Sequence, residues 1–337
     1  MNSPNNFPSS DENEYATSSI FKKQKVKLYE IKHFLFDFGG VLIEKSFVLD
    51  NLFDFIEHDL NIKIPSKEID PYLKKLRRRL SSGRISARTF LESIFETYYV
   101  PFQKKNEALP PKKVNIEYYL ELWFNLYSQV THISSDMAEI IDLLHLAGYT
   151  VSLLSNTYDI HAKSNELRGF YDNFDNVFLS NEIGLIKPDM DKYIYVLKKL
   201  GSKPKRCIFV DDKISNLIPA HELGIIVIKF ESFEKFKQQL NDIGIIEISP
   251  NLRKEIKKKY ESYKKKKKEY NKIKREYKKA KKKYLNKRYR KKKSLKRRLD
   301  FQKKRAEYQK KKIEYQNERD KKKEELISKV KLNFYSN

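Results

Sequence analysis

Four short segments of the chain carry residue types that suit phosphoryl chemistry. The stretch FLFDFGGVLI at 34–43 places one acid, Asp37, between two apolar runs. A carboxylate at the end of a buried run is costly unless a metal, a hydrogen-bond network or a reaction requires it. The other three segments are LLSNT, GLIKPD and FVDD, which contain Ser155, Asn156, Lys187, Asp211 and Asp212.

Together, these residue types predict metal-assisted phosphoryl transfer to a carboxylate. Acids from separate strands can hold Mg²⁺ through the hard oxygen ligands that this ion prefers. A small hydroxyl and backbone N–H groups can bind the phosphoryl oxygens, and a lysine can offset their charge. One carboxylate with room for attack can then serve as the nucleophile.

Strands that alternate with helices must bring these segments together. Apolar runs that predict strands lie at 32–37, 149–157, 176–180, 206–212 and 225–230, with helical patterns between them. This order predicts an α/β fold with a Rossmann-like parallel sheet covered on both faces. Such sheets bind ligands at the carboxyl ends of their strands. Three strands end in polar residues, so we expect one site if those strands are neighbours.

The four segments, in this order, resemble the motifs of the haloacid dehalogenase-like hydrolase superfamily. The resemblance covers about residues 30–230, where FLFDFGGVLI, LLSNT, GLIKPDMDKY and CIFVDDKISNLIPAHELGI stand in the motif positions. GRIS at 83–86, followed by a helical pattern, is similar to the branch with an inserted helical cap. Within that branch the chain is most similar to small sugar-phosphate phosphatases of the glucose-1-phosphate type.

The resemblance implies a role for each site residue and Mg²⁺ as the cofactor. Asp37 would be the nucleophile that forms an aspartyl-phosphate, and Lys187 would neutralise charge on it. Ser155 and Asn156, together with Lys187, would bind the phosphoryl group of a small phosphorylated substrate. The remaining roles are those of the metal site, in which the ligands would be Asp37, Gly39 through its carbonyl, Asp212 and Asp211, oriented by Asn216.

Gly39 departs from the pattern of this family. Most of its phosphatases carry a second Asp two residues after the nucleophile, which protonates the leaving group and later activates water. Gly39 keeps the backbone carbonyl and lacks that acid. General acid–base assistance contributes roughly 10²–10⁴-fold to a rate. We therefore expect weakened activity, and a preference for substrates with good leaving groups.

Composition divides the chain into two unlike parts. Residues 251–337 hold 39 of the 71 Lys and Arg residues and 11 of the 45 Asp and Glu residues, so the remainder has 32 basic and 34 acidic residues. The resulting interpretation is a disordered segment at 1–28, a core formed by 29–46 and 131–248, a helical cap at 47–130 and a Lys/Arg-rich helical tail at 249–337. A loop is expected at 99–113, where YVPFQKKNEALPPKK interrupts the cap.

The tail is predicted to be a long basic helix. Tyr263, Tyr270, Tyr277 and Tyr284 recur every seven residues, which suggests a coiled coil and self-association. A lone charged helix is an equal alternative. Lysine-rich helices with aromatic residues can also bind nucleic acid or another polyanion, and anionic membrane surfaces are a second candidate.

Two functions remain open from the sequence. The main one is a Mg²⁺-dependent phosphatase, and the alternative is a catalytically weakened scaffold whose basic tail binds nucleic acid or another polyanion. A single cysteine, Cys207, excludes an intrachain disulfide and suits a reducing compartment. No apolar run approaches the roughly 18–20 residues of a membrane span. Cytoplasmic localisation is the expectation.

Overall fold

The computed structural model describes residues 30–106 and 113–245, together with parts of 265–279 and 302–317. The chain divides into two compact units, one of residues 1–141 and 150–245 and one of residues 142–149 and 246–337. The predicted disordered segment at 1–28 lies outside the described residues. No helix among the described residues combines the length and the hydropathy that a membrane span needs.

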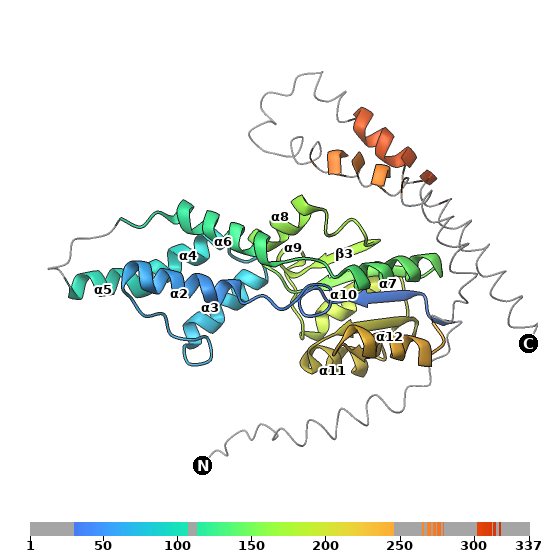
Figure 1. Ribbon diagram of the computed structural model, residues 1–337, viewed down its shortest axis with the longest axis horizontal. Coiled ribbons are helices and arrows are strands. Elements are labelled where there is room, and N and C mark those ends of the chain that lie inside the picture. Colours follow the sequence, from blue (N-terminus) through green and yellow to red (C-terminus); the bar gives the residue numbers. More distant parts are fainter. Residues whose placement is uncertain are drawn as a thin grey trace, which may run out of the picture. The chain divides into compact units, whose positions relative to one another are not determined.

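The first unit contains a five-stranded parallel sheet with the order β3-β2-β1-β4-β5, shown in Figure 1. Nearly every residue of β1, β2 and β4 is buried, without the in-and-out alternation of a half-exposed strand. Both faces of the sheet are therefore covered, as the sequence predicted. The strands are β1 (His33–Phe36), β2 (Thr150–Ser155), β3 (Asn176–Leu179), β4 (Cys207–Asp211) and β5 (Ile226–Lys229).

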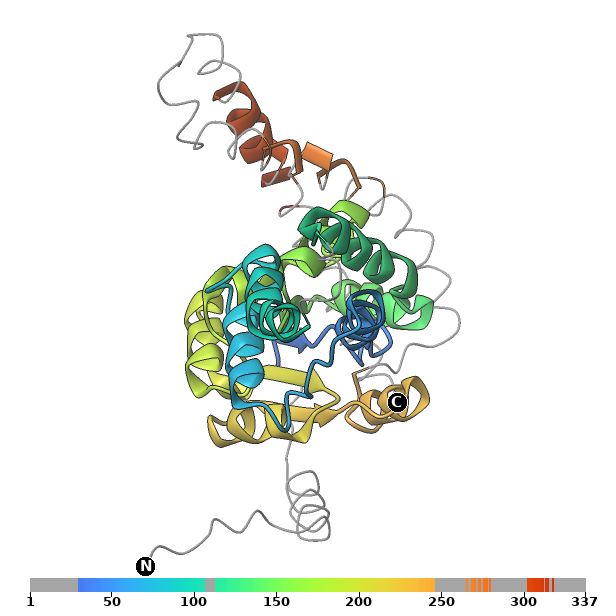
Figure 2. The same ribbon diagram turned by 90° about the vertical axis from the view of Figure 1, so that its left-hand side faces the viewer.

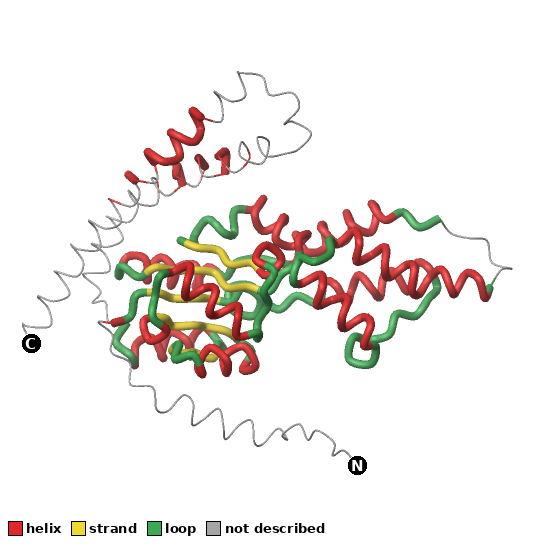
Figure 3. The backbone as a smooth tube through the Cα atoms, turned by 180° about the vertical axis from the view of Figure 1, so that it is seen from behind, coloured by secondary structure: helices red, strands yellow, loops and turns green. Residues whose placement is uncertain are grey.

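Helices surround this sheet, as Figure 3 shows from behind. The loops that end several of these helices turn through glycines in the left-handed conformation, for example Gly169 after α8 and Gly201 after α10. The helices are α7 (Ser135–Leu146), α8 (Asp159–Arg168), α9 (Ser180–Ile183), α10 (Met190–Leu200), η3 (Pro204–Arg206), α11 (Ile214–Glu222) and α12 (Phe233–Asp242).

The central position of β1 decides where the site lies. Phe36, the last residue of β1, is in register with Leu153 of β2 on one side and Val210 of β4 on the other. The carboxyl ends of these three strands are thus neighbours. The residues that follow them meet at one edge of the sheet, as expected from the sequence.

The helical insert between β1 and β2 builds its own apolar core, whose fully buried members include Leu52, Ile56, Phe90 and Trp123. Figure 2 shows these helices turned toward the viewer. The expected loop at 99–113 is wrong in its first half, because α5 occupies this segment with Pro101 in its first turn, where the missing N–H is tolerated. The helices are α2 (Val48–Leu60), α3 (Pro71–Ser81), α4 (Ala87–Ile94), η2 (Phe95–Tyr99), α5 (Val100–Lys105) and α6 (Ile116–Val130).

In the second unit, the described tail residues are helical and pair with each other. The rings of Tyr277 and Tyr308 stack with centroids 4.6 Å apart. Lys304 Nζ lies 2.7 Å from Glu276 Oε2, and Lys311 Nζ lies 3.0 Å from Glu269 Oε1. Later residues of segment 302–317 thus contact earlier residues of segment 265–279, so the two segments run antiparallel. A single long basic helix is therefore not confirmed, because the two described segments pair side by side.

Candidate active site

Three carboxylates converge at the carboxyl edge of the sheet. Asp37 directly follows β1, Asp211 ends β4 and Asp212 comes next, and one oxygen atom of each lies within 4.8 Å of the others. Asp37 is 6% exposed and Asp211 is fully buried. Burial raises the pKa of Asp37 to about 6, although the positive charge of Lys187 acts to lower it. So many buried acids require a cation.

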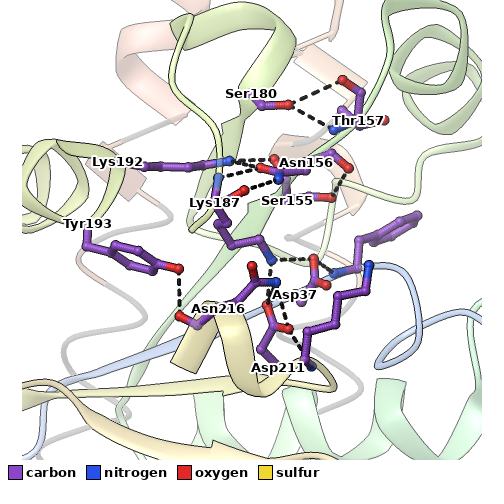
Figure 4. Close-up of polar contacts among 12 residues, drawn as sticks. Asp37, Ser155, Asn156, Thr157, Ser180, Lys187, Lys192, Tyr193, Asp211 and Asn216 are labelled. Carbon is purple, nitrogen blue, oxygen red and sulfur yellow. Dashed lines mark hydrogen bonds and ion pairs between the residues drawn. The ribbon is translucent and has the colours of Figure 1, made fainter. Parts of the chain in front are cut away.

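Lys187 supplies one positive charge among these acids. Its Nζ lies 2.8 Å from Oδ1 of Asp37 and 2.6 Å from Oδ2 of Asp211, and the residue is 3% exposed. Burial alone would lower the pKa of Lys187, but the two carboxylates outweigh that effect and leave the pKa raised. The lysine is therefore held as a cation between the two strand tips, as Figure 4 shows.

Protein donors occupy both oxygen atoms of Asp211. Asn216 Nδ2 donates to each oxygen at 3.0 Å, and the Lys213 N–H donates to Oδ1 at 2.9 Å. Together with Lys187, these contacts fix the carboxylate in place. Asn216, which was predicted to orient the acid pair, thus contacts one of these acids directly, Asp211.

Asp212 is the carboxylate that is open to a metal. Both of its oxygen atoms are buried and accept no hydrogen bond within the described part of the chain, although Lys45 Nζ lies 2.9 Å from Oδ2. Next to it, Gly40 has a φ of +85°, and a Cβ there would lie 2.7 Å from Asp212 Oδ2. Buried carboxylate oxygens that pair with a largely exposed lysine, beside a bare backbone, suit a hard divalent cation, so the residues present fit Mg²⁺.

Gly39 lies beside these acids with room around it. A Cβ added to Gly39 would meet no atom within 4 Å, and its φ lies outside the left-handed region. Neither crowding nor backbone conformation therefore requires a glycine at position 39.

The loop after β2 is tied to the loop that carries Lys187. Asn156 Oδ1 accepts from the Lys187 N–H at 2.9 Å, and Asn156 Nδ2 donates to the Lys187 carbonyl at 2.8 Å. Ser155, 4% exposed, ends β2, and its hydroxyl donates to the Asn156 carbonyl at 3.3 Å. The structure thus brings together all eight residues that the sequence singled out, at the tips of β1, β2 and β4 and on the adjoining loops.

One buried residue of the site was missed. Lys192, in the first turn of α10, is 0% exposed, and its Nζ donates to the Ser155 carbonyl at 2.8 Å and to Asn156 Oδ1 at 2.9 Å. The only sequence signal was its place four residues before Val196, on the buried side of α10.

The cap helices contact the core beside the site. Trp123 of α6 donates from Nε1 to His161 Nε2 of α8 at 2.9 Å, and Arg78 of α3 forms an ion pair with Asp189 at 2.7 Å. Asp189 lies two residues after Lys187, so the cap touches the loop that carries this lysine.

The comparisons with known proteins agree with this geometry. A family model described as haloacid dehalogenase-like hydrolase matches residues 31–224, and the chain belongs to this family. The resemblance expected from the four motifs is therefore confirmed, and with it the expectation of a hydrolase.

Individual relatives are more distant. The D-ribitol-5-phosphate phosphatase of Bacteroides thetaiotaomicron is 26% identical over 230 residues, which cover 63% of this chain and 98% of that protein. The sesquiterpene phosphatase astK of Aspergillus oryzae is 34% identical over 92 residues, which cover 27% of this chain and 46% of that protein. Among solved structures, an HAD family enzyme of Bacteroides thetaiotaomicron is 25% identical, covers 62% of this chain and 98% of its own, and has a TM-score of 0.48.

Proposed function

We propose that the chain is a Mg²⁺-dependent phosphatase that acts on a small phosphorylated metabolite through an aspartyl-phosphate on Asp37. The observation that supports this most is the arrangement of Asp37, Lys187 and Asp211, in which one ammonium lies within 2.8 Å of both carboxylates. Relatives named as phosphatases of ribitol 5-phosphate and of a sesquiterpene favour the same reaction class.

In this mechanism, Asp37 attacks the phosphorus atom and the bond from phosphorus to the leaving oxygen breaks. The leaving oxygen departs with the bonding electron pair. Water then attacks the phosphorus of the aspartyl-phosphate, which releases inorganic phosphate and restores the Asp37 carboxylate. Lys187 offsets negative charge throughout, while Ser155 and the backbone of the Asn156 loop bind the phosphoryl oxygens.

Asp37, Asp212 and the carbonyl of Gly39 would hold Mg²⁺, with Asp211 behind them. When bound, the ion would supply charge neutralisation at the phosphoryl oxygens. The leaving group must take its proton from solvent, because residue 39 offers no acid. We therefore propose that substrates with good leaving groups, such as glycosyl 1-phosphates or acyl phosphates, react faster than primary sugar phosphates.

The test is phosphate release from an activated aryl phosphate with Mg²⁺, comparing Asp37→Asn with the exposed control Asp191→Asn on α10. We expect Asp37→Asn to abolish release and Asp191→Asn to retain it. Unchanged turnover in Asp37→Asn would end the proposal. A leaving-group series on the wild type tests the finer statement, and equal rates across the series would contradict it.

A second function, binding of nucleic acid or another polyanion by the tail, has one observation in its favour. Two of the acids in the described tail segments, Glu269 and Glu276, are engaged by lysines of the paired segment. Exposed lysines such as Lys265 and Lys268 then have few acids to balance them. Binding of the full chain to duplex DNA should weaken steeply with salt, and salt-independent binding, or none, would contradict this function.

A further inference from the structure

Lys192 lies in an unusual place for a lysine. Its side chain begins in the first turn of α10 and runs inward, and the residue has no exposed surface. Figure 4 shows Nζ pointing at the loop after β2. There it donates to the Ser155 carbonyl and to the side-chain oxygen of Asn156. Both acceptors belong to the loop that we propose binds phosphate.

These two contacts extend to the reacting groups through Asn156. The oxygen atom that accepts from Lys192 also accepts from the backbone N–H of Lys187, and the amide nitrogen of the same side chain donates to the Lys187 carbonyl. The orientation of Asn156 therefore fixes the backbone of Lys187. Lys187 in turn reaches Asp37 from that backbone position.

The position is unfavourable for a lysine as a structural residue. Burial lowers the pKa of Lys192 to about 6 and the charge of Lys187 acts in the same direction, whereas Asp37 and Asp211 oppose them. An uncharged amine has two N–H groups, which match the two acceptors. A methionine of similar length would fill the same space without burying an amine, although the Ser155 carbonyl and Asn156 Oδ1 would then lose this donor.

We propose that Lys192 is a positioning residue for the phosphoryl group, holding the Ser155–Asn156 loop in its binding conformation and, through Asn156, placing Lys187. The inference rests on the proposed phosphatase site. Lys192 contacts none of the three acids by hydrogen bond or ion pair within the described residues. Its removal should therefore weaken phosphate binding more than Mg²⁺ binding.

The experiment compares wild type, Lys192→Met and the matched control Val196→Ala, a fully buried neighbour on α10 that belongs to the apolar core. Calorimetry measures the dissociation constants of inorganic phosphate in Mg²⁺ and of Mg²⁺ alone, and urea unfolding measures stability. We expect Lys192→Met to weaken phosphate binding on the order of 10- to 100-fold, by analogy with the loss of residues that orient metal ligands. Mg²⁺ affinity should fall less than phosphate affinity, and only a small loss of stability is expected. Val196→Ala should lower stability and keep phosphate affinity.

Asn156→Ala and the double variant test the route through Asn156. If Lys192 acts through this side chain, the double variant binds phosphate no more weakly than the weaker single variant. If the losses of phosphate affinity in the two single variants multiply in the double variant, the route through Asn156 is overturned. Three results for Lys192→Met would overturn the inference while the phosphatase proposal stands. They are wild-type phosphate affinity, losses of Mg²⁺ affinity and stability as large as the loss of phosphate affinity, and failure of the variant to fold. A wild type that binds no phosphate would instead overturn the phosphatase proposal.

Discussion

Restoring an acid at position 39 should raise activity toward substrates with poor leaving groups. In Gly39→Asp, the new Cβ meets no atom within 4 Å and the backbone φ is not left-handed, so no strain is introduced. The position lies two residues after Asp37, beside the acids. A positioned general acid is worth roughly 10²–10⁴-fold, or about 2.7–5.4 kcal/mol of the activation barrier at 1.36 kcal/mol per tenfold.

Two effects limit that gain. The surrounding residues are not arranged to orient this side chain, so a gain of about tenfold, below the 10²–10⁴-fold of a well-positioned acid, is the expectation for primary alkyl phosphates. The added carboxylate also joins three others within one site. It should therefore lower stability without Mg²⁺, while Mg²⁺ binding removes much of that penalty.

The assay is a series of phosphate esters of increasing leaving-group pKa, measured as kcat/KM for wild type, Gly39→Asp and Gly39→Asn. The Asn variant has nearly the same size and donates no proton to a departing alkoxide. Gly39→Asp should flatten the decline of rate with leaving-group pKa and leave aryl phosphates nearly unchanged. If the Asp and Asn variants give the same series, the reasoning about the missing acid is refuted.

Three further changes test the surroundings of the site. Lys187→Met leaves two buried carboxylates without their shared ammonium, so unfolding in EDTA should show a loss of about 3–5 kcal/mol, and equal stability would contradict the ion-pair geometry. Burial lowers the pKa of His161 to about 3, so the folded protein resists protonation of this residue and loses up to about 4 kcal/mol of stability as the pH falls from about 6.5 to 3. Fluorescence of Trp123, the single tryptophan, should report this acid unfolding. An unchanged acid transition in His161→Gln would contradict the role of His161. Arg78→Ala breaks an exposed ion pair with Asp189 and should change stability by less than about 1 kcal/mol, while KM rises because the cap loses a contact with the Lys187 loop; an unchanged KM or a larger loss of stability would contradict this.

The strand-tip residues were predictable because few structures tolerate their pattern. A carboxylate that ends an apolar run, as Asp37 and Asp211 do, is costly in a core unless a cation, a hydrogen-bond network or a reaction requires it. The parallel sheet followed from the alternation of elements, and the neighbouring strand tips followed from the sheet. The domain boundaries and the individual roles of the site residues stay predictions.

Other features were hidden for physical reasons. Lys192 stands in a helix that also carries Lys198 and Lys199, and local sequence does not distinguish a buried lysine from an exposed one. Pro101 looked like the start of a loop because its tolerance depends on whether it falls in the first turn of a helix. In the tail, a seven-residue tyrosine period fits pairing within the chain as well as between chains, and the period alone cannot decide.

The two paired segments of the tail both carry a positive net charge. By sequence, segment 265–279 carries nine basic and two acidic residues, and segment 302–317 carries six basic and two acidic residues. Pairing brings these two net charges, +7 and +4, side by side, where mobile anions must screen them. The ion pairs of Glu269 and Glu276 and the stacked tyrosines offset only part of this repulsion. We therefore expect higher ionic strength to strengthen the pairing of these two segments, because it screens their mutual repulsion.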